Sequence, residues 1–207
     1  MFKDRVDAAL KLCQKLTFFK NGNFVVVGLT RGGVVTAKEV SKFLNLPLRA
    51  MIVKKIGAPG SPELAIGAIA YSGHVFWNKD LCVRLGINSS LKNIFWKDKQ
   101  KEINLLKKEM GIRLGGNEFR GKNVLLVDDG IATGMSVLAA LESLRKQKVK
   151  KVILAVPVIA IDTLNYIKKY FDGVIYLKKQ KDFYAVSEYY KDFPQVETNE
   201  VSRLLTK

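Results

Sequence analysis

Residues 124–136 read VLLVDDGIATGMS, and this stretch determines how the rest of the sequence is interpreted. The apolar run 124–127 predicts a buried strand that delivers Asp128 and Asp129 to its carboxyl end, where ligands bind in open α/β sheets. Residues 130–136 then turn into a helix. Their small side chains allow successive backbone N–H groups to converge on an anion, so the stretch predicts a phosphate-binding turn.

The two acids of this turn need a partner of their own. Adjacent carboxylates would repel a phosphate, so we expect them to bind sugar hydroxyls or a Mg²⁺ ion shared with a diphosphate. The alternative is that Asp128 and Asp129 only cap a helix, but one acid is sufficient for that. The sequence contains neither a GxxxxGK[ST] loop nor a GxGxxG fingerprint, which excludes those two nucleotide sites.

Strands and helices are predicted to alternate on both sides of the turn. Strands are expected at 24–29, 48–56, 124–128, 152–158 and 173–177, and helices at 3–20, 32–44 and 135–147. This alternation predicts an α/β fold with a parallel sheet covered by helices.

Two insertions interrupt the alternation. Residues 65–78 read as an antiparallel hairpin, and about 90–111 as a long amphipathic helix ending at Gly111. Before them, 57–63 contains Gly-Pro-type breakers and is expected to form an irregular, mobile loop bearing Glu63. Glu63 is interpreted either as a proton acceptor or metal ligand, or as a surface carboxylate. The segment from Lys178 onward is expected to lie as a lid over the sheet edge.

Composition limits the class of protein. The 207 residues, 48% of them hydrophobic, can bury the core of a single domain, and a net charge of +16 favours an anionic partner or reflects solvated lysines. The two cysteines, Cys13 and Cys82, lack the spacing of a zinc site. Charges interrupt the N-terminal apolar residues and no stretch is long enough to span a bilayer, so a cytoplasmic protein without a membrane partner is expected.

The segment VLLVDDGIATGMS resembles the ribose-phosphate motif of the type I phosphoribosyltransferases, apart from Gly130, where a branched apolar residue is commoner. The resemblance implies an open, mostly parallel five-stranded sheet with helices on both faces, plus a small hood. It also implies phosphoribosyl diphosphate as donor, Mg²⁺ as cofactor, a nitrogenous, purine-like acceptor and a homodimer. Within one domain, the core would be about 20–60 and 120–178, the insertion 61–119 and the hood 178–207.

The resemblance also implies roles for single residues. Asp128 and Asp129 would bind the ribose hydroxyls, and the metal indirectly through the donor, as catalytic residues together with Arg31. The 5′-phosphate would be held by Ala132, Thr133, Gly134, Met135 and Ser136. The diphosphate would be held by Thr30, Arg31, Gly32, Lys54 and Lys55, although strand alternation allows only one of the two lysines to face the site. Arg31 could equally be an exposed arginine on a turn.

The resemblance extends to KKIGAPGSPELAIGAIA and, near the end, to DFYAVSEYYKDFPQV. Phe183 and Tyr184 in the second segment are candidates for stacking on a planar acceptor, or for packing within the lid. Ala132 occupies the position where 6-oxopurine enzymes carry an aspartate, which leaves the general base unassigned. His74, the single histidine, is interpreted as a turn residue.

Two other functions compete with transfer. One is a non-catalytic regulator that senses phosphoribosyl diphosphate and binds nucleic acid, which the net charge favours and the absence of a helix-turn-helix opposes. The other is hydrolysis of a phosphorylated sugar or nucleotide, with water as the acceptor.

Overall fold

Five apolar runs of the chain form one parallel sheet, in the order β2-β1-β6-β7-β8. The computed structural model describes residues 1–113 and 117–206. The strands are β1 (Phe24–Leu29), β2 (Leu48–Met51), β6 (Asn123–Val127), β7 (Lys151–Ala160) and β8 (Gly173–Gln180). The predicted α/β class and parallel sheet are confirmed.

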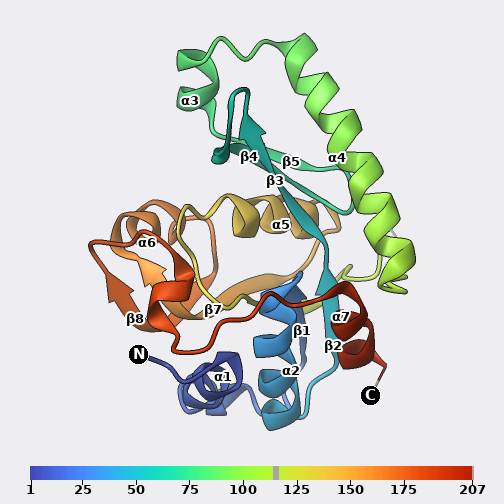
Figure 1. Cartoon of the computed structure of the whole chain (residues 1–207). Helices are drawn as coiled ribbons and strands as arrows, with labels where there is room; N and C mark the ends of the chain where they lie inside the picture. Colours follow the sequence, from blue (N-terminus) through green and yellow to red (C-terminus); the bar gives the residue numbers. More distant parts are fainter. Residues whose placement is uncertain (114–116, 207) are drawn as a thin grey trace.

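Helices cover both faces of this sheet (Figure 1). α1 (Arg5–Cys13) and α2 (Gly32–Leu44) lie on one face, and α5 (Met135–Lys146) and α6 (Ile161–Ile167) on the other. Gly28 allows α2 to lie directly on β1, because a Cβ at this position would be 2.7 Å from the Cβ of Ala37.

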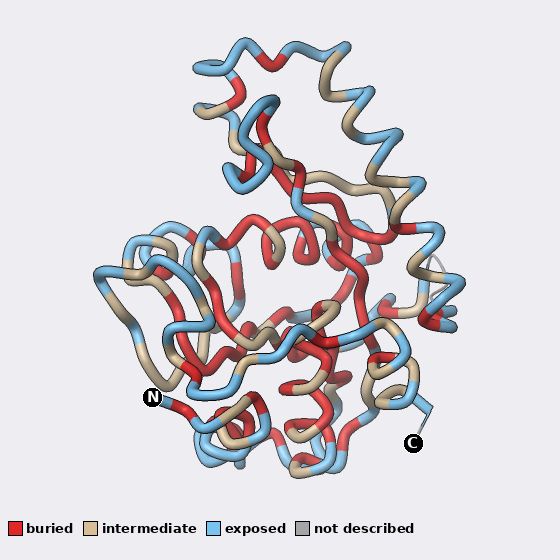
Figure 2. Tube along the Cα trace, in the orientation of Figure 1, coloured by how far each residue is buried: buried red, intermediate tan, exposed pale blue. Residues whose placement is uncertain are grey.

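The insertion builds a second layer above α5 (Figure 1). β3 (Val53–Ala58), β4 (Ser61–Ala70) and β5 (Val75–Trp77) form an antiparallel sheet, followed by α3 (Lys79–Arg84) and α4 (Ser89–Glu109). The predicted hairpin and long helix are both present, and Gly111, with φ +61°, follows the end of α4. Figure 2 shows that α3 and α4 are largely exposed, whereas α5 is largely buried.

Three sequence predictions were wrong in detail. The expected strand 48–56 is two strands in different sheets, because the chain leaves the main sheet at Ile52. The expected loop 57–63 is the end of a β-hairpin with its turn at 59–60, and a register shift at Gly57 accommodates the breakers. The expected helix 3–20 is α1 followed by the short 3₁₀ helix η1 (Thr17–Phe19).

The C-terminal segment returns to the N-terminus and then crosses the molecule to β2 (Figure 1). It contains the 3₁₀ helix η2 (Val186–Tyr189) and the helix α7 (Thr198–Leu205). These two helices, as well as α3 and α6, were not predicted from the sequence. The amide of Phe2 donates to the carbonyl of Tyr189, and the amide of Lys191 donates to the carbonyl of Phe2. The N-terminal residues are therefore paired with the segment at the end of η2.

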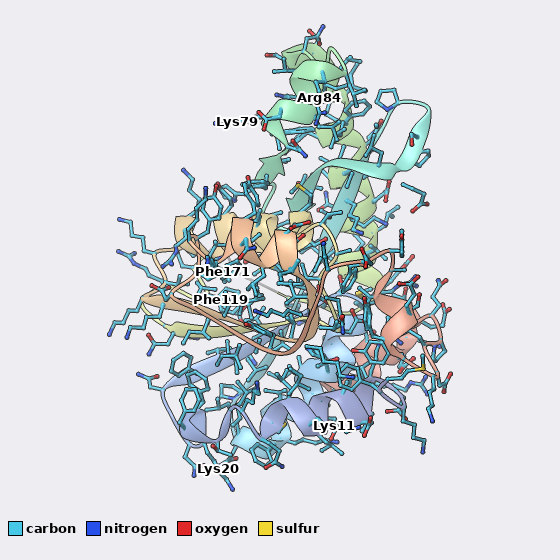
Figure 3. All side chains as sticks on the ribbon, turned by 90° about the vertical axis from the view of Figure 1, so that its left-hand side faces the viewer. Lys11, Lys20, Lys79, Arg84, Phe119 and Phe171 are labelled. Atoms are coloured by element: carbon cyan, nitrogen blue, oxygen red, sulfur yellow. The ribbon has the colours of Figure 1, made fainter. Side chains whose placement is uncertain are left out.

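Figure 3 shows Phe119 and Phe171 inside the molecule, with Lys79 and Arg84 at the α3 end and Lys11 and Lys20 at the opposite end. Both phenylalanines belong to the core on the α5 face of the main sheet. None of the helices in the described part of the chain combines the length and apolar character that crossing a membrane requires.

Candidate functional site

The neighbouring strands β1 and β6 mark the point where the strand order reverses. β1 continues through α2 to β2 on one side, and β6 continues through α5 to β7 on the other. Such a switch point opens a crevice at the carboxyl ends of the two strands, and ligands of open α/β sheets bind there. Residues 30–32, which include predicted diphosphate residues, and the predicted turn 128–136 both follow these strands at this crevice.

Two glycines at the start of α2 let the acids of the second loop approach. A Cβ on Gly33 would lie 2.5 Å from Oδ1 of Asp128, and one on Gly32 would overlap Oδ2 of Asp129. The beginning of α2 and the end of β6 are thus in direct contact. A cavity of about 260 Å³ lies beside them. It is lined by Arg5, Lys55, Asp128, Asp129, Gly130, Ile131, Ala132, Thr133, Gly134, Ser136, Val137, Val186 and Phe193.

Asp129 forms an ion pair with an arginine that lies near the N-terminus. Arg5 Nε donates to Asp129 Oδ2 at 2.7 Å, and the Tyr190 hydroxyl donates to the Asp129 carbonyl at 2.5 Å. Burial raises the pKa of Asp129, and the guanidinium of Arg5 opposes that rise. Arg5 was missed by sequence reasoning, because nothing in residues 1–13 distinguishes it from an ordinary charge at the start of an amphipathic helix.

Asp128 has a different environment. Its Oδ1 accepts a hydrogen bond from the amide of Asp129 at 3.0 Å. Burial raises the pKa of Asp128 well above its usual range, and the neighbouring charge of Asp129 raises it further, while Lys55 acts in the opposite direction. The two acids are therefore not equivalent: the pKa of both is raised, but only Asp129 is paired with a cation.

The turn after the acids is open at the N-terminus of α5. The N-cap is Gly134 with φ +75° and without a side-chain cap, so neither aspartate caps this helix. The first amides of a helix have no partner within the helix and are available to an anion. The turn is fixed from behind, because Ile131 pairs with the end of β7 and the Thr163 hydroxyl donates to the Ala132 carbonyl.

Four of the five predicted diphosphate residues line a second cavity of about 350 Å³, which is lined by Thr30, Arg31, Val53, Lys54, Lys55 and Leu106. Gly32 lies against Asp129 instead. Lys55 lines both cavities and connects them. Lys54 is ion-paired with Glu102 at 3.0 Å, and Arg31 lies 3.9 Å from Glu197. The peptide bond between Thr30 and Arg31 is cis.

The other candidate residues lie elsewhere. Phe183 stacks on Tyr189 at 4.8 Å between ring centroids, and Tyr184 is 83% exposed, so their role in acceptor stacking stays a prediction. From the same segment, Val186 and Phe193 line the first cavity instead. Glu63 is exposed on β4, and His74 lies in the β4–β5 turn with Nδ1 2.9 Å from the Ser72 hydroxyl.

Gly130, the departure from the family motif, is explained by the C-terminal segment. A Cβ on this residue would lie 2.5 Å from Cγ1 of Val186, so Val186 occupies the space that a branched side chain would need. We expect Gly130→Val to lower the free energy of unfolding by about 1–3 kcal/mol through overpacking. Val186→Ala added to Gly130→Val should restore most of that loss in urea denaturation. Strict additivity of the two substitutions would contradict this packing.

Comparison with known proteins identifies similar chains. The model of the phosphoribosyl transferase domain matches residues 2–194. A Mycobacterium tuberculosis protein, Rv0571c, provisionally named a phosphoribosyl transferase, is 35% identical over 209 residues. That alignment covers 100% of this chain and 47% of the relative, so the chain spans about half the length of the curated relative.

Solved structures agree with this similarity. The crystal structure of TT1426 from Thermus thermophilus has a TM-score of 0.81 and 33% identity, with 99% of this chain and 97% of that chain covered. A hypoxanthine phosphoribosyltransferase from Staphylococcus aureus has a TM-score of 0.50 at 15% identity, covering 86% of this chain and 76% of that one. The second likeness concerns the fold alone.

Proposed function

The chain belongs to the phosphoribosyl transferase domain family, and from that premise we propose that it binds 5-phosphoribosyl 1-diphosphate and transfers the phosphoribosyl group to a nitrogen of a purine-like acceptor. The observation that carries the proposal is the convergence of three parts at one switch point. These are the acid pair Asp128 and Asp129, the uncapped turn before α5, and the second cavity with its cations.

Each part has one task in the proposed reaction. The turn from Ala132 to Ser136 holds the 5′-phosphate through amides and hydroxyls, and the carboxylates orient the ribose hydroxyls. Arg31 and Lys55 offset the charge that develops on the diphosphate as its bond to the anomeric carbon breaks. The acceptor nitrogen forms the new bond and releases a proton, while Val186 and Phe193 limit the access of water.

The residues at this site fit Mg²⁺ that is held mainly by the donor. Among the described residues, no group of three or more His, Cys, Asp or Glu side chains could hold a metal ion, and the charge of Asp129 is already paired with Arg5. Mg²⁺ readily shares phosphate and water oxygens with one or two carboxylates, and Asp128 and Asp129 would hold it through the donor. When bound, it neutralises part of the diphosphate charge.

Incubation with phosphoribosyl diphosphate, Mg²⁺ and a panel of purine and pyrimidine bases, followed by measurement of diphosphate release, tests this function. We expect release that depends on one class of base. Release without any base would indicate hydrolysis. Absence of release with every base, despite binding of the donor, would contradict transfer to these acceptors. The homodimer and the cytoplasmic location also stay predictions.

Lys55 and Lys54 provide an internal comparison. We expect Lys55→Met to weaken donor binding about tenfold or more, because Lys55 faces both cavities and would lose a charge-assisted bond. Lys54→Met should have a smaller effect, since Lys54 is held by Glu102. Calorimetric titration of the donor in Mg²⁺ measures both. Equal effects would contradict the different roles assigned to the two lysines.

One structural feature favours the nucleic-acid alternative. The backbone pairs 121–122 with 148–150, because the Gly121 amide donates to the Lys148 carbonyl and the Lys150 amide to the Lys122 carbonyl. This brings exposed cations together. These cations are Arg120, Lys122, Arg145, Lys146, Lys148, Lys150 and Lys151. Filter binding of RNA and DNA across salt concentrations tests this function, and negligible affinity at physiological salt would remove it.

A further inference from the structure

One buried side chain near the N-terminus joins the acid pair of the site to the segment between η2 and α7. Arg5 begins α1, is only 8% exposed, and lines the first cavity. Its Nε donates to Asp129 Oδ2, and its Nη1 donates to the carbonyl of Pro194 at 2.7 Å. Its guanidinium carbon lies 3.6 Å from the centre of the Phe193 ring. Contacts with Pro194 and Phe193 therefore hold the guanidinium of Arg5 in the position in which it binds Asp129.

The contacts of Arg5 divide the tasks of the two acids. Oδ2 of Asp129 is bound to the guanidinium, and Tyr190 holds the main chain of the same residue. Asp128 lies on the same cavity, and within the described chain its carboxylate accepts from the Asp129 amide and forms no ion pair. Of the two carboxylates, the one at position 128 is thus the one that forms no ion pair within the described chain.

Arg5 also changes the charge that a polyanionic donor meets. An ionised carboxylate beside the phosphate turn would repel the donor, and the arginine offsets the charge of Asp129 at 2.7 Å. Because the side chains of Arg5 and Asp129 are only 10% and 13% exposed, water screens this pairing weakly.

We propose that Arg5 is a positioning residue for the ribose site, which acts by fixing Asp129 and so leaves Asp128 as the carboxylate that binds the ribose hydroxyls. This inference rests on the proposed binding of phosphoribosyl diphosphate. Arg5 acts through Asp129 and has no contact of its own with the donor, so its contribution disappears when Asp129 is neutral.

A double-mutant cycle tests this role, with the dissociation constant of phosphoribosyl diphosphate in Mg²⁺ measured by calorimetry well below each melting temperature. We expect Arg5→Met to weaken binding about tenfold or more, as loss of a charge-assisted bond at the site would. Arg5→Lys should restore part of the affinity, since it keeps the charge and loses the fork to Pro194. Arg49→Met is the matched control, because Arg49 is also ion-paired through Nε but to Glu118, away from both cavities.

The decisive comparison is between Asp129→Asn and the double variant Arg5→Met/Asp129→Asn. The double variant removes both buried charges together, so it remains informative if Arg5→Met alone does not fold. Equal dissociation constants within about twofold support the positioning role. A further tenfold loss on removing Arg5 would mean that Arg5 binds the donor directly, and would overturn the inference.

Two other outcomes are also decisive. A folded Arg5→Met variant with unchanged affinity would overturn the positioning role and leave the proposed function intact. Failure of the unsubstituted protein to bind the donor would overturn the proposed function, and the positioning role with it.

Discussion

The Asp128→Asn variant is expected to melt at a higher temperature than the unsubstituted protein at neutral pH and yet to lose donor binding by about a hundredfold or more. The loss follows from removal of the carboxylate that accepts the ribose hydroxyls. The higher melting temperature follows from the environment of Asp128. Burial and the neighbouring Asp129 raise the pKa of Asp128 well above its usual range, so its ionisation opposes folding.

The pH dependence has a definite sign. Because the pKa of Asp128 is higher in the folded than in the unfolded protein, the folded state holds more protons between these two values. The contribution of Asp128 to stability is therefore full below the unfolded pKa and falls as pH rises through the folded pKa. Thermal melting across pH should show this fall in the unsubstituted protein and a weaker fall in Asp128→Asn. Identical pH profiles would contradict the assigned environment of Asp128.

Asp129→Asn is the matched comparison, and its effect on stability should have the opposite sign. It leaves the buried guanidinium of Arg5 without its anion, and breaking a buried pair of this kind costs about 3–5 kcal/mol. Donor binding should also weaken. Two neighbouring aspartates would then differ in the direction of their effect on folding although the pKa of both is raised, because only Asp129 has a buried cation as its partner.

The second large effect is expected at Gly33. A Cβ here would lie 2.5 Å from Asp128 Oδ1, 3.0 Å from Asp128 Cα and 3.1 Å from the carbonyl oxygen of Val127. Two of these atoms are backbone, so Gly33→Ala must displace the end of β6 from α2. We expect a loss of about 1–3 kcal/mol in the free energy of unfolding and about a hundredfold in donor binding, because Asp128 moves.

Gly173→Ala is the control for this substitution. A Cβ on Gly173 would meet Ile153 at 3.7 Å, an ordinary contact, so its effect should be small. Urea denaturation and calorimetric titration measure both variants. Donor binding by Gly33→Ala at the unsubstituted affinity would show that the close approach of α2 to the acids is not needed.

The sequence predicts the parts of the site that are local in the chain. Three contiguous parts of the sequence indicate three parts of the site. The apolar run 124–127 indicates a strand, the two acids indicate ligands, and the small residues after them indicate an anion-binding turn. The alternation of Lys54 and Lys55 is also local, but it does not separate them fully, because both lysines line the second cavity and Lys55 also lines the first.

Other features depend on contacts that no local pattern encodes. Arg5 is 124 residues from Asp129, and a charge at the start of a helix has the same appearance whether it is solvated or buried. The break between β2 and β3 was missed because residues 50–53 are all buried, so no periodicity marks the exit from the sheet. The aromatic content of the C-terminal segment does not show which of its side chains face the site. Phe183 and Tyr184 were the candidates from this segment, and Val186 and Phe193 are the residues of it that line the first cavity.

The central claim is that the turn from Asp128 to Ser136 holds phosphoribosyl diphosphate. Calorimetric titration of this donor with Mg²⁺ into the unsubstituted protein and Asp128→Asn tests it most directly. We predict saturable binding of one donor per chain in the first, displaced by ribose 5-phosphate, and a loss of about a hundredfold or more in the second. Binding of equal affinity to both proteins would contradict the account.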